Sequence, residues 1–124
     1  DKIWVRSETV HEFKPKTTNR PISQKTTEKM KEILIKAVEE GSAKWTKLDR
    51  LVVAGKTGTA QIPIAGHYDE EKTIASFIGF APADDPKFVM LISLREPESS
   101  PWGSETAAPV WFNIAEKLSY YWGI

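Results

Sequence analysis

Ile74-Ala75-Ser76-Phe77-Ile78-Gly79-Phe80-Ala81 is an apolar run. Its apolar residues occupy both sets of alternating positions, so neither face of a strand formed by it would be polar enough to face solvent. A short link, residues 82–86, joins it to a second run of the same kind, residues 87–95. The link is rich in proline and aspartate, so the two runs should form an antiparallel hairpin. Strands that are apolar on both faces must be covered from both sides. This stretch therefore predicts an α+β fold, in which helices pack on the faces of an antiparallel sheet.

Two helices are expected to supply that cover. The first follows Ser23, a good N-cap candidate, and stops at Gly41. Its apolar face consists of Met30, Ile33, Leu34, Ala37 and Val38. The second helix closes the chain after Thr106, which can cap it. Its apolar stripe consists of Val110, Ile114 and Leu118.

The remaining segments complete the organisation of the chain. Residues 51–62 form a third strand-like run between the helices. Residues 2–13 predict one or two short strands, and the polar, proline-punctuated residues 14–21 predict a loop. The chain thus divides into a lead-in, residues 1–21, and a body, residues 22–124, with a helix, the third strand, the hairpin and the closing helix.

The composition excludes several classes of protein. The 124 residues carry 17 Lys plus Arg against 17 Asp plus Glu, and this balance predicts no nucleic-acid partner. The absence of cysteine excludes disulfides, thiolate metal sites and a cysteine nucleophile. His11 and His67 lie far apart in the sequence, so we expect neither a metal nor another cofactor. No apolar run approaches the roughly 20 residues that a membrane-spanning helix needs.

The segment that carries chemistry is Val53-Ala54-Gly55-Lys56-Thr57-Gly58-Thr59-Ala60-Gln61. Its Gly-Lys-Thr triplet does not belong to a phosphate loop, because Arg50 occupies the position of the first glycine of that motif. What remains is Lys-Thr-Gly at the end of an apolar strand. A lysine there supplies a cation for an anionic group, a threonine adds a hydroxyl donor, and a glycine lets an extended ligand lie close.

Two further residues extend this candidate site. Thr59 lies two residues beyond Thr57, so both hydroxyls should lie on one face of the strand. The backbone N–H of Thr59 could contribute to an oxyanion hole, where one donor lowers the barrier by about 3 kcal/mol. Gln61 could approach bound substrate from the strand end, although glutamines on strands are often simply solvated.

From about residue 20 to residue 124, the sequence resembles the C-terminal part of the transpeptidase domain of class B penicillin-binding proteins. The similarity rests on five segments in the family's order: Ile22-Ser23 with Thr26 and Met30, Val53 to Gln61, Ile74 to Pro82, the apolar strand after Pro86, and Ala107-Ala108-Pro109-Val110-Trp111-Phe112. The resemblance implies a peptidoglycan D,D-transpeptidase that cross-links stem peptides through an acyl-serine intermediate. It implies a location on the outer face of the bacterial membrane, with an N-terminal anchor outside this chain.

The resemblance also implies roles for the site residues. Lys56, Thr57 and Thr59 would bind the carboxylate of the substrate or of a β-lactam, and the N–H of Thr59 would form half of the oxyanion hole. The strand that contains Gly58 would pair with the stem peptide of peptidoglycan.

The chain departs from the family pattern at the nucleophile. None of its serines has a lysine three positions later, and there is no Ser-x-Asn. We therefore expect a partial transpeptidase domain that cannot form an acyl-enzyme alone. Its expected partner is the missing N-terminal part of the same domain. A β-lactam-sensing receptor domain and a non-catalytic interaction module are the alternatives. Only two helices are predicted, so an exposed apolar face, or self-association that hides it, is also expected.

Overall fold

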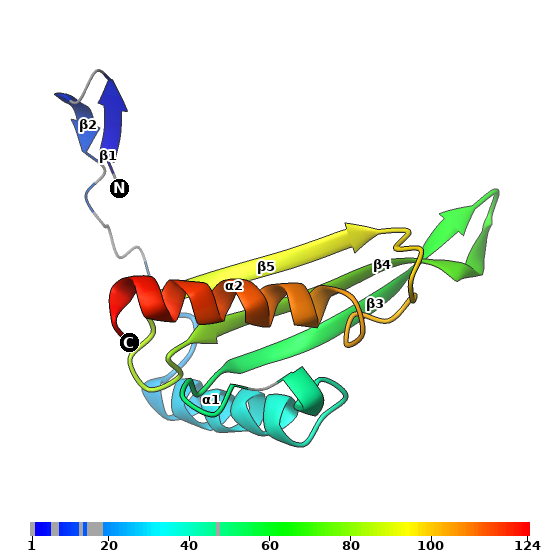
Figure 1. Ribbon diagram of the computed structural model, residues 1–124, viewed down its shortest axis with the longest axis horizontal. Coiled ribbons are helices and arrows are strands. Elements are labelled where there is room, and N and C mark those ends of the chain that lie inside the picture. Colours follow the sequence, from blue (N-terminus) through cyan, green and yellow to red (C-terminus); the bar gives the residue numbers. More distant parts are fainter. Residues whose placement is uncertain (1, 6–7, 13, 15–18, 47) are drawn as a thin grey trace.

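The computed structural model describes residues 2–5, 8–12, 14, 19–46 and 48–124. Its main sheet is antiparallel and has the order β3-β4-β5. These strands are β3 (Ala54–Ile64), β4 (His67–Ala81) and β5 (Phe88–Arg95). Two long helices flank the sheet, α1 (Gln24–Glu39) and α2 (Ala107–Trp122), as Figure 1 shows, and a short 3-10 turn, η1 (Lys44–Thr46), follows α1. The α+β architecture and the β4–β5 hairpin are as the sequence predicts.

The lead-in forms a hairpin of its own. Strands β1 (Lys2–Val5) and β2 (Glu8–Glu12) pair antiparallel with each other, which confirms the strands expected there. Of the loop predicted for residues 14–21, residues 15–18 lie outside the described residues, and residues 14 and 19–21 have no helix or strand.

Strands β3 and β4 form a long hairpin whose far end projects beyond the sheet (Figure 1). Ala65 and Gly66 connect them with φ angles of 48° and 89°, values typical of a tight hairpin turn. The pairing register shifts between Gln61 and Pro63, where proline lacks the N–H that the ladder needs. The strand begins at Ala54, later than the predicted start at residue 51.

Helix α2 covers one face of the sheet with an aromatic cluster. The ring of Phe77 lies 5.2 Å from that of Trp111 and 5.4 Å from that of Phe112, centre to centre. Trp111 is fully buried, and its indole N–H donates to the carbonyl of Met90 at 2.8 Å. The core therefore lies between α2 and strands β4 and β5, and it extends to Val38 of α1 and to Leu51 and Val53 before β3.

The predicted apolar stripe of α2 is wrong. Val110 is 42% exposed, and Ile114 and Leu118 are only partly buried. The buried face instead consists of Ala107, Ala108, Trp111, Phe112, Ala115 and Ser119. Small side chains on this face let the helix approach the sheet closely, although they contribute little to an apolar pattern.

The two helix starts differ in their chemistry. The Ser23 hydroxyl accepts a hydrogen bond from the Thr26 N–H at 3.1 Å, which confirms the predicted cap of α1. Thr106 occupies the cap position of α2, but its side chain does not cap the helix. Its hydroxyl donates to the carbonyl of Trp102 at 2.7 Å and so ties the helix to the preceding loop.

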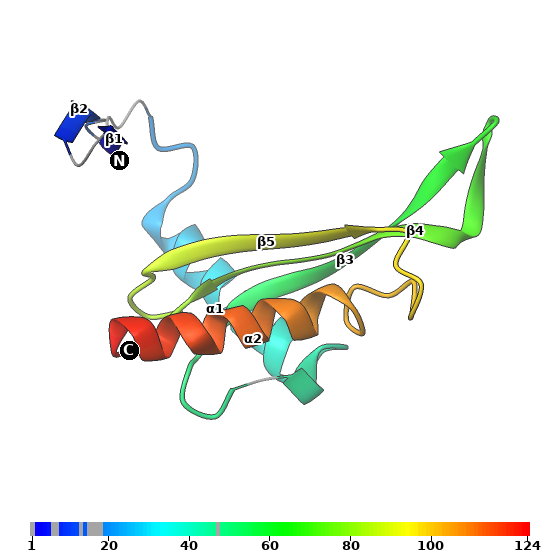
Figure 2. The same cartoon turned by 45° about the horizontal axis from the view of Figure 1, so that its top comes forward.

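The opposite side of the sheet is only partly covered. Helix α1 contacts β3 and passes behind the sheet in Figure 2. Its one buried residue, Val38, belongs to the same core cluster as Phe112 of α2. Ile78 pairs with Leu91 on β5, and both are about half exposed. Val89, two residues before Leu91, is 71% exposed. These three residues form the exposed apolar face that the sequence predicts.

We expect this face to drive self-association of the 124-residue chain, because contiguous apolar surface is removed from water when two copies meet. Leu91→Lys should lower both the self-association seen in sedimentation equilibrium and the binding of a hydrophobic dye. Asn113→Lys, an exposed change on α2, is the matched control and should leave both unchanged. A chain that sediments as a monomer at all concentrations and binds no dye contradicts this prediction.

Candidate active site

The candidate site is built on β3, an edge strand that pairs only with β4 in the described part of the chain. The ammonium of Lys56 donates to the carbonyl of Thr57 at 3.0 Å and to its hydroxyl at 3.2 Å. The Thr57 carbonyl is therefore accessible at the strand edge. Because backbone groups alternate along a strand, the N–H and C=O of Thr59 are directed to this same edge.

A cavity of about 420 Å³ lies beside this edge. Three of the five predicted site residues line it: Lys56, Thr57 and Thr59. The other lining residues come from the turn after α1 and from the loop before α2: Ser42, Trp102, Ser104 and Glu105. Residues from three separate segments thus meet around the Lys-Thr-Gly strand.

The two hydroxyls of β3 have different partners. The Thr57 Oγ1 accepts from Lys56 and lies 3.5 Å from the Ser42 Oγ. The Thr59 Oγ1 accepts from the backbone N–H of Gly103 at 3.2 Å. Lys56 is exposed and forms no ion pair among the residues that the structure describes, so its charge is available to an anionic ligand.

The two remaining predicted residues lie outside the cavity lining. A Cβ on Gly58 would come within 2.6 Å of the Ser76 Oγ across the ladder, so a neighbouring side chain restricts this position. Ser76 donates to the Gly58 carbonyl at 3.5 Å, the limit of a hydrogen bond. Gln61 is exposed farther along β3, next to the shift in register, and alternation places it on the face of Thr57 and Thr59.

Sequence reasoning did not assign Ser42, Gly103 or Glu105 to the site. They lie outside the Lys-Thr-Gly segment, and no spacing rule connects them to it. For Gly103 and Glu105 the only signal is the short stretch Trp102-Gly103-Ser104-Glu105 ahead of a helix, which is ambiguous in the absence of tertiary structure, and Ser42 has no such signal.

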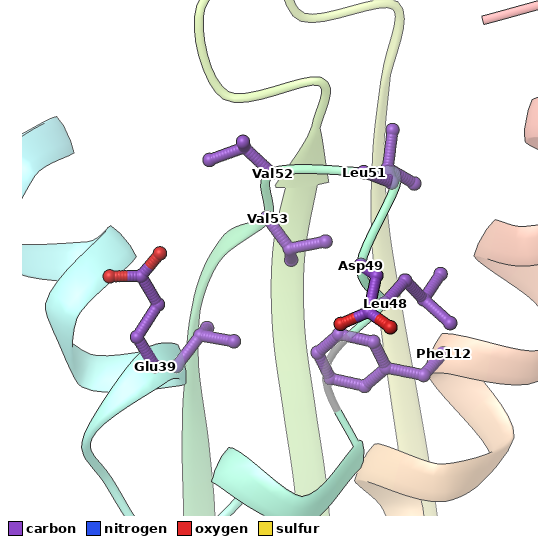
Figure 3. Close-up of a pocket in the computed structure, with 8 residues that line it drawn as sticks. Glu39, Leu48, Asp49, Leu51, Val52, Val53 and Phe112 are labelled. Carbon is purple, nitrogen blue, oxygen red and sulfur yellow. The ribbon is translucent and has the colours of Figure 1, made fainter.

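A second, smaller cavity of about 150 Å³ lies away from this edge, where α1, the segment before β3 and α2 meet (Figure 3). It is lined by Val38, Glu39, Leu48, Asp49, Leu51, Val52, Val53 and Phe112. None of the predicted site residues belongs to it.

Among the described residues, no group of three or more histidine, aspartate or glutamate side chains could hold a metal ion. Neither long helix there is apolar enough to cross a bilayer.

The arrangement of these elements matches that of known penicillin-recognising domains. Apo penicillin-binding protein 3 of Mycobacterium tuberculosis aligns with a TM-score of 0.80 and 27% identity, over 95% of this chain and 29% of that one. The transpeptidase domain of penicillin-binding protein 3 of Burkholderia pseudomallei gives a TM-score of 0.79 and 28% identity, over 90% and 34%. The sheet, the two helices and the Lys-Thr-Gly edge strand thus define a penicillin-recognising fold.

Sequence comparison gives the family. The chain matches the penicillin binding protein transpeptidase domain over residues 2–116, and it belongs to that family. It is 38% identical to stage V sporulation protein D of Bacillus subtilis over 117 residues, which cover 91% of this chain and 18% of that protein. It is 33% identical to the probable peptidoglycan D,D-transpeptidase PenA of Neisseria flavescens over 97 residues, 77% of this chain and 24% of that protein. The chain therefore spans about a quarter or less of these two relatives.

Proposed function

We propose that this chain forms the carboxylate-binding side of the active site of a peptidoglycan D,D-transpeptidase. The observation that supports this most strongly is the grouping of Lys56, Thr57 and Thr59 around one cavity at an accessible strand edge. Lys56 supplies the charge, and the hydroxyls of Thr57 and Thr59 supply directed donors to a substrate or β-lactam carboxylate. The open edge of β3, with Gly58 at its centre, pairs with the stem peptide, and Gln61 flanks the bound ligand.

The chemistry also requires a serine nucleophile from another part of the protein. The serine oxygen attacks the peptide carbonyl while a general base takes its proton, and the negative charge on the carbonyl oxygen is stabilised by the N–H of Thr59. Collapse of this intermediate expels the terminal D-alanine, which takes up the proton, and leaves an acyl ester on the serine. The amine of a second stem peptide then attacks the ester, forms the cross-link and returns the proton to the serine.

The rest of the transpeptidase domain is the proposed partner of this segment. The short span of the chain against its relatives and the exposed apolar face around Ile78, Val89 and Leu91 both support this assignment. In the complete protein we place the domain on the extracytoplasmic face of the membrane, held by an anchor outside this chain. β-Lactams are proposed as ligands because a similar domain, penicillin-binding protein 3 of Mycobacterium tuberculosis, has been solved as a complex with ampicillin.

Labelling with a fluorescent penicillin tests this function. The 124-residue chain is expected to show no covalent band in denaturing electrophoresis, because it has no Ser-x-x-Lys. The complete domain, this segment joined to the part that carries the nucleophile, should give a strong band. The same domain with its nucleophilic serine changed to alanine is the control and should give none.

A covalent band on the 124-residue chain would overturn the proposal that the nucleophilic serine lies in another part of the protein. A complete domain that folds but is never labelled would instead favour a non-catalytic interaction module. Full labelling without any cross-linking of stem peptides would favour a β-lactam-sensing receptor.

A further inference from the structure

The loop between β5 and α2 contacts the Lys-Thr-Gly strand through Gly103. There the backbone N–H of Gly103 donates to the Thr59 hydroxyl oxygen at 3.2 Å, although the two residues lie 44 positions apart. Figure 1 shows this loop, residues 96–106, turning back toward β3 before α2 begins. The loop therefore reaches a residue of the proposed carboxylate site through its backbone.

Gly103 can approach this closely because it has no side chain. A Cβ there would lie 2.4 Å from the carbonyl oxygen of Ser76 and 2.5 Å from that of Gly58, both of them backbone atoms of the sheet. Any other residue would have to lift the loop away from β3 and β4.

Hydrogen bonds on both sides hold the Gly103 amide in place. The Thr73 hydroxyl donates to the carbonyl of Pro101 at 2.7 Å, and the Thr106 hydroxyl donates to that of Trp102 at 2.7 Å. The carbonyl of Gly103 itself accepts from the Ala108 N–H at 2.8 Å. The loop is thus fixed to the sheet and to the first turn of α2 before any ligand arrives.

This contact has a chemical consequence for the Thr59 hydroxyl. A threonine hydroxyl has one hydrogen to donate and two lone pairs that accept. The Gly103 amide occupies an acceptor position, and within the described residues the Thr59 hydroxyl makes no other hydrogen bond. Its own hydrogen is left for an acceptor in the cavity that Lys56 and Thr57 also line.

We propose that Gly103 is a positioning residue for the carboxylate site. Its N–H orients the Thr59 hydroxyl so that the hydroxyl hydrogen points at the ligand carboxylate beside Lys56. This inference rests on the proposed function, and it adds a backbone group from the loop between β5 and α2 to the residues that select an anionic ligand.

The test is the preference of the complete domain for a carboxylate. Acylation rates are measured with a penicillin and with its methyl ester, which keeps the reactive ring and removes the negative charge. The unaltered domain should react faster with the free acid. Gly103→Ala should lower the ratio of the two rates about tenfold, since a hydrogen bond to a charged group is misaligned. Thr59→Val should lower it at least as much, and the double variant should show no further loss.

Two companion proteins complete the design. An amide-to-ester replacement at Gly103, made by chemical ligation, removes the N–H without adding atoms and should also lower the ratio. It serves as the second test of the same hydrogen bond when Gly103→Ala impairs folding. Ser99→Ala, an exposed change in the same loop, should leave the ratio unchanged.

The outcomes separate this inference from the proposed function. If the Gly103 variants lower the acylation rates with both compounds equally, Gly103 has only a structural role and the inference is wrong. The proposed function is not affected by that result. If the unaltered domain reacts with neither compound, the proposed function fails and the inference fails with it.

Discussion

Replacing Trp111 with alanine is expected to lower the free energy of unfolding of the 124-residue chain by about 3–5 kcal/mol. Trp111 is fully buried, and its ring centre lies within about 6 Å of those of Phe77, Phe88 and Phe112 in tilted or edge-on contacts. Its indole N–H donates a hydrogen bond to the Met90 carbonyl. Removing a buried tryptophan costs about 3–5 kcal/mol, a large part of the roughly 5–15 kcal/mol that stabilises a typical domain. Urea denaturation followed by circular dichroism measures the loss in the free energy of unfolding.

Tyr121→Ala is the matched control for this prediction. Tyr121 is an aromatic residue of the same helix, but it is 84% exposed. Its replacement should change the free energy of unfolding by less than about 0.5 kcal/mol. Equal losses in the free energy of unfolding for the two variants would mean that the aromatic cluster does not stabilise the packing of α2 on the sheet.

Among substitutions in the candidate site, removal of the Lys56 charge should have the largest effect on activity. In the complete domain, we expect Lys56→Ala to slow acylation by a carboxylate-bearing penicillin about 10- to 100-fold. The reason is that a hydrogen bond between charged groups contributes about 1.5–3 kcal/mol. The measurement is the second-order rate of labelling, and the methyl ester of the same penicillin should be affected much less.

Lys117→Ala controls for a simple change in net charge. Lys117 is exposed on α2, outside the cavity, so its loss should leave the labelling rate unchanged. An unchanged labelling rate for Lys56→Ala would mean that Lys56 does not bind the carboxylate, and it would contradict the proposed carboxylate-binding site as a whole.

The parts of the fold that the sequence predicts correctly are those that depend on local pattern. Residues 74–81 and 87–95 are apolar on both faces and joined by a short link, and they form the β4–β5 hairpin. The cap at Ser23 is correct for the same reason, since the hydroxyl and the Thr26 N–H that it accepts from are three residues apart. The grouping of Lys56, Thr57 and Thr59 was also predictable, because all three lie on one strand.

The parts that sequence does not predict depend on tertiary contacts. The buried face of α2 is rich in alanine, whose small apolar surface gives a weak periodic signal, so Val110, Ile114 and Leu118 are more conspicuous in the pattern although they are less buried. Ser42 reaches Thr57 from 15 residues away and Gly103 reaches Thr59 from 44. Such contacts are set by how the loops cross the sheet, which no local spacing encodes.

The accessible edge of β3 also has a consequence for the solubility of the chain. A strand edge that can accept a peptide as an extra strand can equally accept a strand from another copy, and such edges seed aggregation unless something prevents it. A lysine on an edge strand is one natural safeguard, because two copies that pair there bring like charges together. We therefore expect Lys56, which is proposed to bind a carboxylate, also to oppose edge-to-edge pairing between two copies of the chain.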